Sequence, residues 1–314
     1  MCKENKGEMT YAPIALFTYN RADHAQRAVE SLLQNAEAKD SDLFIFSDGA
    51  KNEKAIKGVE DNRKYIHTVT GFKTITIIER EKNWGLANSL IAGITDVINK
   101  YGRVIVVEDD LILSSYFLKF MNDGLEKYKD DDRVSSISGF IPNVKAELPN
   151  TFFLRYFECW GWATWDRAWK LLNTDTKYLL RKVRMRTYDF NFDGSCGLYG
   201  ILYCQKVGSV DSWYIRLYAS FYLANKLTLF PGHTLVTNEG FDGSGTHCKK
   251  EAESSSAIFY DKPVFLTDIK VSENKEARKY MSSTFKQRLP KVGLKSCVDR
   301  FKSFVRRLFY IDCM

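Results

Sequence analysis

The stretch Gly102-Arg103-Val104-Ile105-Val106-Val107-Glu108-Asp109-Asp110 joins an apolar run to three consecutive carboxylates. Four β-branched residues in a row predict a strand buried on both faces, which is typical of a parallel sheet. Open α/β sheets bind their ligands in the crevice beyond the carboxyl ends of the strands. The triplet Glu108-Asp109-Asp110 therefore lies where such a sheet would hold a ligand.

The triplet also suggests a metal ion. Adjacent carboxylates repel one another, and their burial is costly unless a cation balances them. Oxygen ligands without a neighbouring Cys or His suit Mg²⁺ or Mn²⁺, which proteins commonly share with the phosphates of a substrate. A solvated acidic turn after the strand is the alternative, and the triplet alone does not decide between the two.

Apolar runs and helical patterns alternate along the chain before the triplet. Strands are predicted at residues 13–18, 43–47 and 73–78, and amphipathic helices at residues 23–34, 56–69 and 86–98. Asp23, with Gln26 three residues later, fits a capping box at the start of the first helix. The alternation predicts an α/β fold, in which a mostly parallel sheet with right-handed crossovers is flanked by helices.

The first half lacks the glycine-rich loops that bind phosphate in two large protein classes. Neither GxGxxG nor GxxxxGK occurs, which argues against a dinucleotide-dependent dehydrogenase and a P-loop NTPase. Phosphate would then be bound by a metal ion and side chains. The net charge of +7 suits an anionic ligand or a membrane surface. The basic residues are dispersed and no recognition motif occurs, so no nucleic-acid partner is expected.

The cysteines and the N-terminus bear on the compartment. The seven cysteines are odd in number and form no CxxC pair, which predicts reduced thiols in a cytosolic protein without zinc. The first ten residues are polar and contain no apolar signal region, and no window approaches the ~20 apolar residues of a membrane span. A cytoplasmic protein is therefore expected.

The second half begins with a predicted helix at residues 117–128 and a strand at 134–138, and then becomes rich in aromatic residues. Residues 152–169 hold eight aromatic side chains, which either offer platforms to sugars or form a packed core. The basic run 181–186 is interpreted as a solvated face. Asp211 stands before a predicted helix and is either its N-cap or a functional carboxylate. A glycine-rich loop, residues 238–247, ends in His247.

Three segments are predicted. Residues 11–145 and 146–252 form the two halves of one domain, and residues 253–314 form a C-terminal tail with a helix. Residues 294–309 of the tail place Val298, Phe301, Phe304, Val305 and Leu308 on one helical face among basic residues. Such a helix either lies on an anionic membrane surface, which would make the protein peripheral on the inner face of the membrane, or docks on the main domain.

Several motifs resemble those of GT-A-fold glycosyltransferases and occur in the same order along the chain. They are most similar to the group that includes the Golgi N-acetylglucosaminyltransferase I and related bacterial family-2-like sugar transferases. The resemblance covers roughly residues 13–248. The motifs are Phe17-Thr18-Tyr19-Asn20-Arg21, Phe46-Ser47-Asp48-Gly49, Asn83-Trp84-Gly85-Leu86-Ala87-Asn88, Val106-Val107-Glu108-Asp109-Asp110, Trp160-Gly161-Trp162-Ala163-Thr164-Trp165 and Asn238-Glu239-Gly240-Phe241 through Thr246-His247.

The resemblance implies a role for individual residues. Asp211 resembles the general base, although Ser212 replaces the second Asp of a paired Asp-Asp found in the enzyme of that group. Asp110 would bind the metal, together with His247. Acceptor-binding residues would be Trp160, Gly161 and Trp162. Residues implied to bind the nucleotide-sugar are Thr18, Asn20, Arg21, Asp48, Asn83, Gly85, Asn88, Glu108 and Asp109.

The expected function is therefore metal-dependent, inverting transfer of a sugar from a UDP-linked donor to a glycan or lipid-linked acceptor, in the synthesis of cell-surface polysaccharide. Mn²⁺ or Mg²⁺ is the expected cofactor. Two alternatives remain open. A sugar nucleotidyltransferase would normally carry a glycine-rich, lysine-bearing loop after its first strand, which Tyr19-Asn20-Arg21 does not supply. A non-catalytic protein would bind a nucleotide-sugar or carbohydrate without turning it over.

Overall fold

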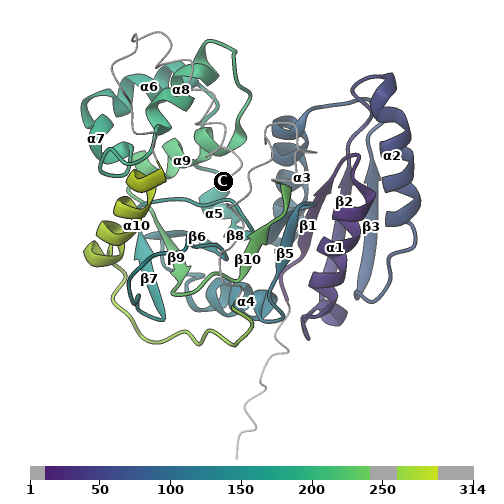
Figure 1. Ribbon diagram of the computed structural model, residues 1–314, viewed down its shortest axis with the longest axis horizontal. Coiled ribbons are helices and arrows are strands. Elements are labelled where there is room, and N and C mark those ends of the chain that lie inside the picture. Colours follow the sequence, from purple (N-terminus) through teal and green to yellow (C-terminus); the bar gives the residue numbers. More distant parts are fainter. Residues whose placement is uncertain (1–10, 241–259, 289–314) are drawn as a thin grey trace, which may run out of the picture.

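The computed structural model describes residues 11–240 and 260–288. Its centre is an eight-stranded sheet of order β3-β2-β1-β4-β8-β6-β9-β7 (Figure 1). The strands of this sheet are β1 (Ile14–Thr18), β2 (Asp42–Ser47), β3 (Thr74–Glu79), β4 (Arg103–Glu108), β6 (Val134–Ser138), β7 (Thr151–Leu154), β8 (Trp162–Trp165) and β9 (Leu227–Pro231). A second sheet pairs β5 (Leu111–Leu113) with β10 (Val236–Asn238).

The helices lie on both sides of the large sheet and above the second half (Figure 1). They are α1 (Ala22–Leu33), α2 (Glu53–Ile66), α3 (Leu86–Tyr101), α4 (Phe117–Lys127), α5 (Asp166–Trp169), α6 (Thr176–Val183), α7 (Thr187–Phe190), α8 (Leu198–Lys206), α9 (Trp213–Leu223) and α10 (Lys275–Arg288), with the short 3-10 helices η1 (Ala38–Asp40) and η2 (Arg184–Arg186).

The first four strands are parallel to one another, which confirms the predicted fold class. Strand β1 pairs with β2 and β4, and β2 pairs with β3. The chain moves outward from β1 to β3 and then returns to β4 on the other side of β1. Right-handed crossovers therefore place α1 and α2 on one face and α3 on the other. The strand order reverses between β1 and β4, which is the switch point where such sheets bind ligands.

The second half continues the sheet with antiparallel pairs. Strand β8 runs antiparallel to both β4 and β6, so that Trp162 lies opposite Val106. Strand β9 pairs in parallel with β6 and antiparallel with β7. Most of the aromatic segment is packed inside this half, because the side chains of Phe152, Phe157 and Trp162 are fully buried. For these rings the packed core is the correct interpretation.

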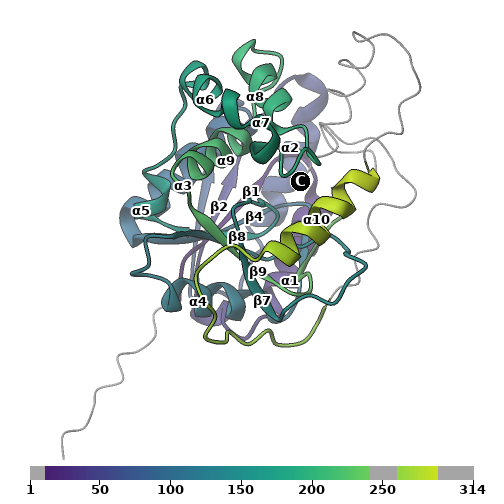
Figure 2. The same cartoon turned by 90° about the vertical axis from the view of Figure 1, so that its left-hand side faces the viewer.

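Helix α10 lies against the second half (Figure 2). The backbone N–H of Asn274 donates to the carbonyl of Phe153 at 2.8 Å. The buried guanidinium of Arg278 pairs with carboxylates of Asp189 and Glu273, at 2.9 and 2.8 Å. Residues 260–288 are therefore held to the domain by backbone and charged contacts. The segment boundaries expected from the sequence stay a prediction, and residues 294–309 and their expected membrane contact lie outside the described residues.

The predicted cap of the first helix is wrong, and one of the two alternatives for Asp211 is excluded. Helix α1 begins at Ala22, and its N-cap residue Arg21 makes no side-chain capping bond. Asp23 is the second residue of the helix, and in this first turn its negative charge still suits the helix dipole. Helix α9 is capped by Ser212, whose Oγ accepts from the N–H of Ile215 at 3.3 Å, and not by Asp211. The described part of the chain contains no helix with the length and apolar character needed to cross a bilayer.

Candidate active site

The carboxylates of the triplet meet Arg21 at the switch point of the sheet. Arg21 follows β1, and Asp109 and Asp110 follow the adjacent strand β4. The Nη2 group of Arg21 donates to Asp109 and, at 3.0 Å, to Oδ2 of Asp110. The backbone N–H of Tyr19 also donates to Asp109, at 3.3 Å. Parallel pairing of β1 with β4 thus brings the predicted Arg21, Asp109 and Asp110 into one site.

This site gathers three carboxyl groups in a partly buried place. Burial, together with the charges of Asp110 and Asp109, raises the pKa of Glu108 to about 8. Burial also raises the pKa of Asp109 to about 6, although the Arg21 charge opposes this shift. Burial by itself would lower the pKa of Arg21, but the two aspartates raise it above its ordinary value. One guanidinium therefore only partly balances the triplet, and a further cation would be stabilised here.

The second half of the chain returns to the triplet through β10. Asn238 lies opposite Leu111 in the β5–β10 pair, and the N–H of Glu239 donates to the carbonyl of Asp110 at 2.8 Å. The N–H of Gly240 donates to Oδ1 of Asn238 at 2.7 Å. A Cβ at Gly240 would lie 2.5 Å from Oδ2 of Asp110, so a larger residue at this position would displace the Asp110 carboxylate.

The donor atoms of the triplet fit a hard divalent cation. Carboxylate oxygens are the ligands that Mg²⁺ and Mn²⁺ prefer, and Mg²⁺ sites commonly use one or two carboxylates together with substrate phosphates. Within residues 11–240 and 260–288, no group of three or more His, Cys, Asp or Glu side chains is arranged to hold a metal by itself. Asp109 and Asp110 would thus supply part of a coordination shell. His247 lies outside the described residues.

Asp48 lies at the carboxyl end of β2, and its carboxylate is occupied by its own chain. It accepts from the backbone N–H groups of Gly49, Trp84 and Gly85, each at 2.9 Å in its shortest contact. The amide of Asn83 donates to it at 3.1 Å and to the carbonyl of Gly49 at 2.8 Å. These hydrogen bonds join the loop after β2 to the loop after β3, and so bring Asp48, Asn83 and Gly85 together.

The remaining residues predicted to bind nucleotide lie around this edge. Thr18 is buried, and its hydroxyl accepts from the amide of Asn62 at 2.9 Å. Asn20 lies against α2, because a Cβ at Gly58 would be 2.7 Å from its carbonyl oxygen. Asn88 is exposed on α3 and donates to the carbonyl of Trp84 at 3.0 Å. Of these three, Asn88 offers the most accessible side chain to a ligand.

Asp211 is more than half exposed and lies at the start of α9. Its carboxylate accepts from Nη2 of Arg216 at 3.1 Å. Two residues later, the ring of Trp213 stacks on Trp162 with centroids 5.7 Å apart. Trp162 is itself opposite Val106, two residues before the triplet. This chain of contacts ties the start of α9 to the strand that carries Glu108.

The residues predicted to bind the acceptor differ in accessibility. Trp162 is completely buried between Trp213 and Phe157, so an acceptor does not reach its side chain in this structure. Trp160 is nearly buried and packs edge-on against Phe140. Gly161 has a positive φ of 61°, and a Cβ there would lie 2.9 Å from a ring carbon of Phe117. The turn is therefore fixed by close packing.

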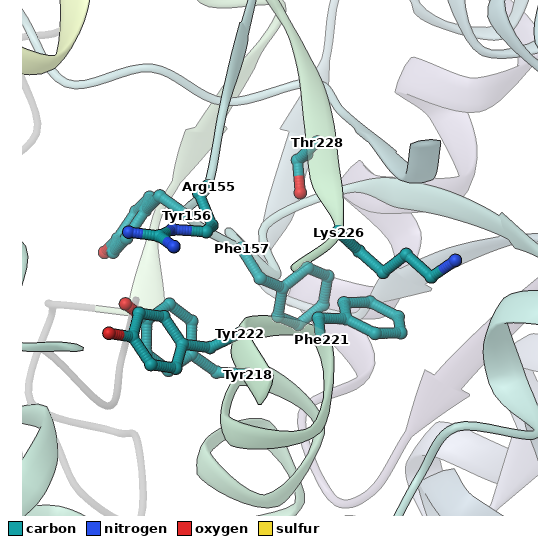
Figure 3. A pocket seen from close by; sticks show the side chains of 8 residues that line it. All are labelled: Arg155, Tyr156, Phe157, Tyr218, Phe221, Tyr222, Lys226 and Thr228. Carbon is teal, nitrogen blue, oxygen red and sulfur yellow. The ribbon is translucent and has the colours of Figure 1, made fainter. Parts of the chain in front are cut away.

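A small pocket lies in the second half, and Figure 3 shows the side chains that line it. It is too small for a sugar. Its volume of about 10 Å³ is near the minimum that one water molecule needs. Arg155 lies over the ring of Tyr222 at 4.9 Å, and both side chains bind Asp189, which also pairs with Arg278. The pocket therefore belongs to the contact that fixes α10. Its lining residues are Arg155, Tyr156, Phe157, Tyr218, Phe221, Tyr222, Lys226 and Thr228.

Three residues of the site were not identified from the sequence as site residues. Tyr19, Asn238 and Gly240 each belong to one of the motifs above, but no role was predicted for them. The motif Asn238-Glu239-Gly240-Phe241 contained a usable signal, because a glycine often marks a close backbone approach. Nothing in the local sequence, however, connects this loop with Asp110.

Replacing Arg21 by glutamine is expected to destabilise the protein by about 3 kcal/mol when divalent cations are chelated. The variant leaves the nearly buried Asp109 without its charged partner, and removing one member of a buried pair costs about this much or more. Thermal unfolding in EDTA would measure the loss. Mn²⁺ should then stabilise the variant more than the wild type, because a ligand that binds only the folded state raises its stability.

Arg27→Gln is the matched control for this variant. Arg27 lies on α1, the helix that begins directly after Arg21, and forms a surface pair with Glu239 at 2.7 Å. Such a pair is expected to contribute no more than about 1 kcal/mol. Mn²⁺ should stabilise the Arg27→Gln protein by the same amount as the wild type. An Arg21→Gln protein as stable in EDTA as the wild type would contradict the role of Arg21 as counter-ion.

Known proteins that are distantly similar to this chain include a plant transferase and a mannosyltransferase of solved structure. It is 23% identical over 223 residues to an alpha-1,3-mannosyl-glycoprotein 2-beta-N-acetylglucosaminyltransferase of Arabidopsis thaliana, covering 60% of this chain and 49% of the plant protein. The chain thus spans about half the length of that relative. The solved structure of mannosyltransferase PcManGT from Pyrobaculum calidifontis, in complex with GDP-Man and Mn²⁺, matches with a TM-score of 0.38 and 13% identity, over 70% of this chain and 72% of that one. A structural match with this TM-score and identity carries no information on the function of this chain.

The match to a protein family is more extensive. The model of glycosyl transferase family 2 matches residues 14–190, which is more than half of the chain. The matched segment contains β1 to β8 and the triplet, so it includes the switch point at which Arg21 meets Asp109 and Asp110. The family and the sheet topology agree with the predicted GT-A fold. This chain belongs to glycosyl transferase family 2.

Proposed function

We propose that this protein is a metal-dependent, inverting glycosyltransferase that moves a sugar from a UDP-linked donor to a hydroxyl group of a glycan or lipid-linked saccharide, in the synthesis of cell-surface polysaccharide. The observation that carries the proposal is the convergence of Arg21, Asp109 and Asp110 at the switch point of the sheet. Family membership and the name of the plant relative, an N-acetylglucosaminyltransferase, support sugar transfer.

The donor side of the site would stabilise negative charge. Transfer breaks the bond between the anomeric carbon and the diphosphate, so positive charge develops on the sugar and negative charge on the leaving group. Arg21 is placed to balance part of that charge, and Asp109 and Asp110 would hold Mn²⁺ or Mg²⁺. The ion, when bound, supplies Lewis-acid stabilisation of the diphosphate. The Asn83–Gly85 loop and Asn88 would lie along the nucleoside.

The acceptor side requires one carboxylate on the face of the sugar opposite the diphosphate. There the acceptor oxygen forms its bond to the anomeric carbon while its proton passes to a general base. Asp211 is the proposed base, because it is accessible and is tied to the triplet strand through Trp213 and Trp162. Its bond to Arg216 would orient the carboxylate.

The proposal is tested with a panel of nucleotide-sugars in the presence of Mn²⁺ or EDTA. A donor should raise the melting temperature only with the metal, and donor hydrolysis or transfer to an oligosaccharide should follow the same metal dependence. Binding without turnover under all acceptor conditions would favour the non-catalytic alternative. Release of pyrophosphate from a nucleoside triphosphate and a sugar phosphate would instead indicate a sugar nucleotidyltransferase.

A further inference from the structure

Trp84 is an exposed tryptophan at the edge where the nucleoside is expected. Its exposed fraction is 43%, whereas the other five tryptophans are at most 8% exposed. The guanidinium of Arg80 lies over the indole, 3.9 Å from the ring centroid. Because Arg80 covers one face of the ring, the exposed part of the indole is the surface that Arg80 does not cover. A large aromatic ring left in water beside a ligand site suits a flat partner.

The position of Trp84 is set by Asp48. A carboxylate offers about four lone-pair sites, and Asp48 already accepts from three backbone N–H groups and one side-chain amide, including the N–H of Trp84. It has little remaining capacity to accept a bond from a nucleobase. The two loops also touch directly, since a Cβ at Gly49 would lie 2.5 Å from the carbonyl carbon of Lys82. Asp48 therefore fixes the loop that presents Trp84.

Arg80 is likewise fixed by its backbone. Its N–H donates to the carbonyl of Ser47 at 2.9 Å, and its own carbonyl accepts from Nη2 of Arg63 at 2.7 Å. Among the described residues, the buried Nε and Nη2 atoms of Arg80 have no hydrogen-bond partner. The guanidinium lies closest to the ring of Trp84 and also lies over the ring of Phe46, 5.9 Å from its centroid. It therefore supports the indole from behind.

The distance from this loop to the triplet suits a nucleoside diphosphate. Strands β3, β2, β1 and β4 are consecutive neighbours in the sheet. Three strand spacings of ~4.8 Å separate the end of β3 from the end of β4 by about 14 Å. An extended nucleoside diphosphate is comparable in length, with its base at one end and its terminal phosphate at the other. A diphosphate near Asp110 would place the base beside Trp84.

We infer that Trp84, supported by Arg80, is the stacking platform for the nucleobase of the donor, and that Asp48 is a positioning residue rather than a direct reader of the base. This inference rests on the proposed function. It predicts that recognition of the nucleoside depends on the aromatic ring at position 84. Binding of the phosphates alone should not depend on this ring.

The test measures binding of UDP, GDP and inorganic pyrophosphate in the presence of Mn²⁺ by calorimetry. Trp84→Ala should weaken the binding of UDP and GDP about tenfold, which is within the range that loss of a base–aromatic stack produces. It should leave pyrophosphate binding unchanged. Trp84→Phe should bind UDP and GDP almost as tightly as the wild type. Nucleotide binding should quench the tryptophan fluorescence of the wild type, and Trp84→Phe should lose that quenching.

Phe265→Ala is the matched control, because Phe265 is an exposed aromatic residue of the segment that precedes α10, outside the proposed site. It should bind all three probes normally. Unchanged binding of UDP and GDP by Trp84→Ala, or unchanged quenching in Trp84→Phe, overturns the platform but leaves the proposed function intact. Failure of the wild type to bind any of the three probes overturns both.

Asp48→Asn tests the positioning role. The variant keeps the size of the side chain but can accept fewer hydrogen bonds from the loop. Nucleotide-induced quenching of Trp84 should therefore decrease, and the binding of UDP and of GDP should weaken by the same factor. Pyrophosphate should again bind normally. A changed preference between UDP and GDP with quenching retained would mean that Asp48 contacts the base directly, and would overturn this role.

Discussion

Asp110→Ala is expected to lower kcat/KM for sugar transfer by at least about 10³-fold. The variant removes a proposed metal ligand, and Lewis-acid stabilisation of a leaving group contributes several kcal/mol to the transition state. The fold should remain intact, because Arg21 keeps its contact with Asp109 and the backbone carbonyl of Asp110 still accepts from Glu239. Steady-state kinetics at several Mn²⁺ concentrations, together with thermal unfolding, would measure both effects.

The control for this variant is Asp96→Ala. Asp96 is an exposed carboxylate of α3, so its removal changes the net charge by the same amount without touching the site. It should leave both kcat/KM and the Mn²⁺-dependent rise in melting temperature near the wild-type values. If Asp110→Ala kept wild-type turnover at ordinary Mn²⁺ concentrations, Asp110 would not be a metal ligand.

The sequence was sufficient to predict the framework of the site. The strands β1, β2, β3 and β4 were recognisable because each is a short apolar run followed by polar residues, and amphipathic helical patterns separate them. Parallel strands place their carboxyl ends at the same edge. The position of Glu108-Asp109-Asp110 at the ligand edge followed from these two rules, and Arg21 lies beside it because β1 and β4 are neighbours.

Other features depend on contacts between distant parts of the chain. The approach of Gly240 to Asp110 joins residues 130 positions apart, and no local pattern signals it. The four donors that occupy Asp48 come largely from the loop after β3, which the sequence does not place. Aromatic composition likewise fits either a sugar platform or a core, and only the burial of Trp162 on β8 decides between them.

Neighbouring residues that are equally suited to cap a helix also limited the prediction. Asp211 and Ser212 are adjacent, and both residue types are good N-caps, so local sequence does not choose between them. The structure assigns the cap of α9 to Ser212. This separation matters for the mechanism, because the proposed base and the helix cap are now different residues that can be changed independently.

Asp211→Asn is expected to lower kcat by about 10²–10⁴-fold with little change in donor affinity. A general base contributes about this much, and it acts on the acceptor proton in the transition state and not on the bound donor. The variant keeps the shape of the side chain, so it preserves a hydrogen-bond acceptor for Arg216. Single-turnover transfer rates, compared with donor affinity by calorimetry, would separate the two effects.

Ser212→Ala provides the contrasting variant. It removes the bond from the N–H of Ile215 and should destabilise the protein by about 1 kcal/mol, while kcat stays near the wild-type value. Asp211→Asn should show the reverse behaviour, with normal thermal stability and a large loss of kcat. If Asp211→Asn instead turned over normally, Asp211 would be only the partner of Arg216, and the general base would have to be sought on another residue facing the acceptor.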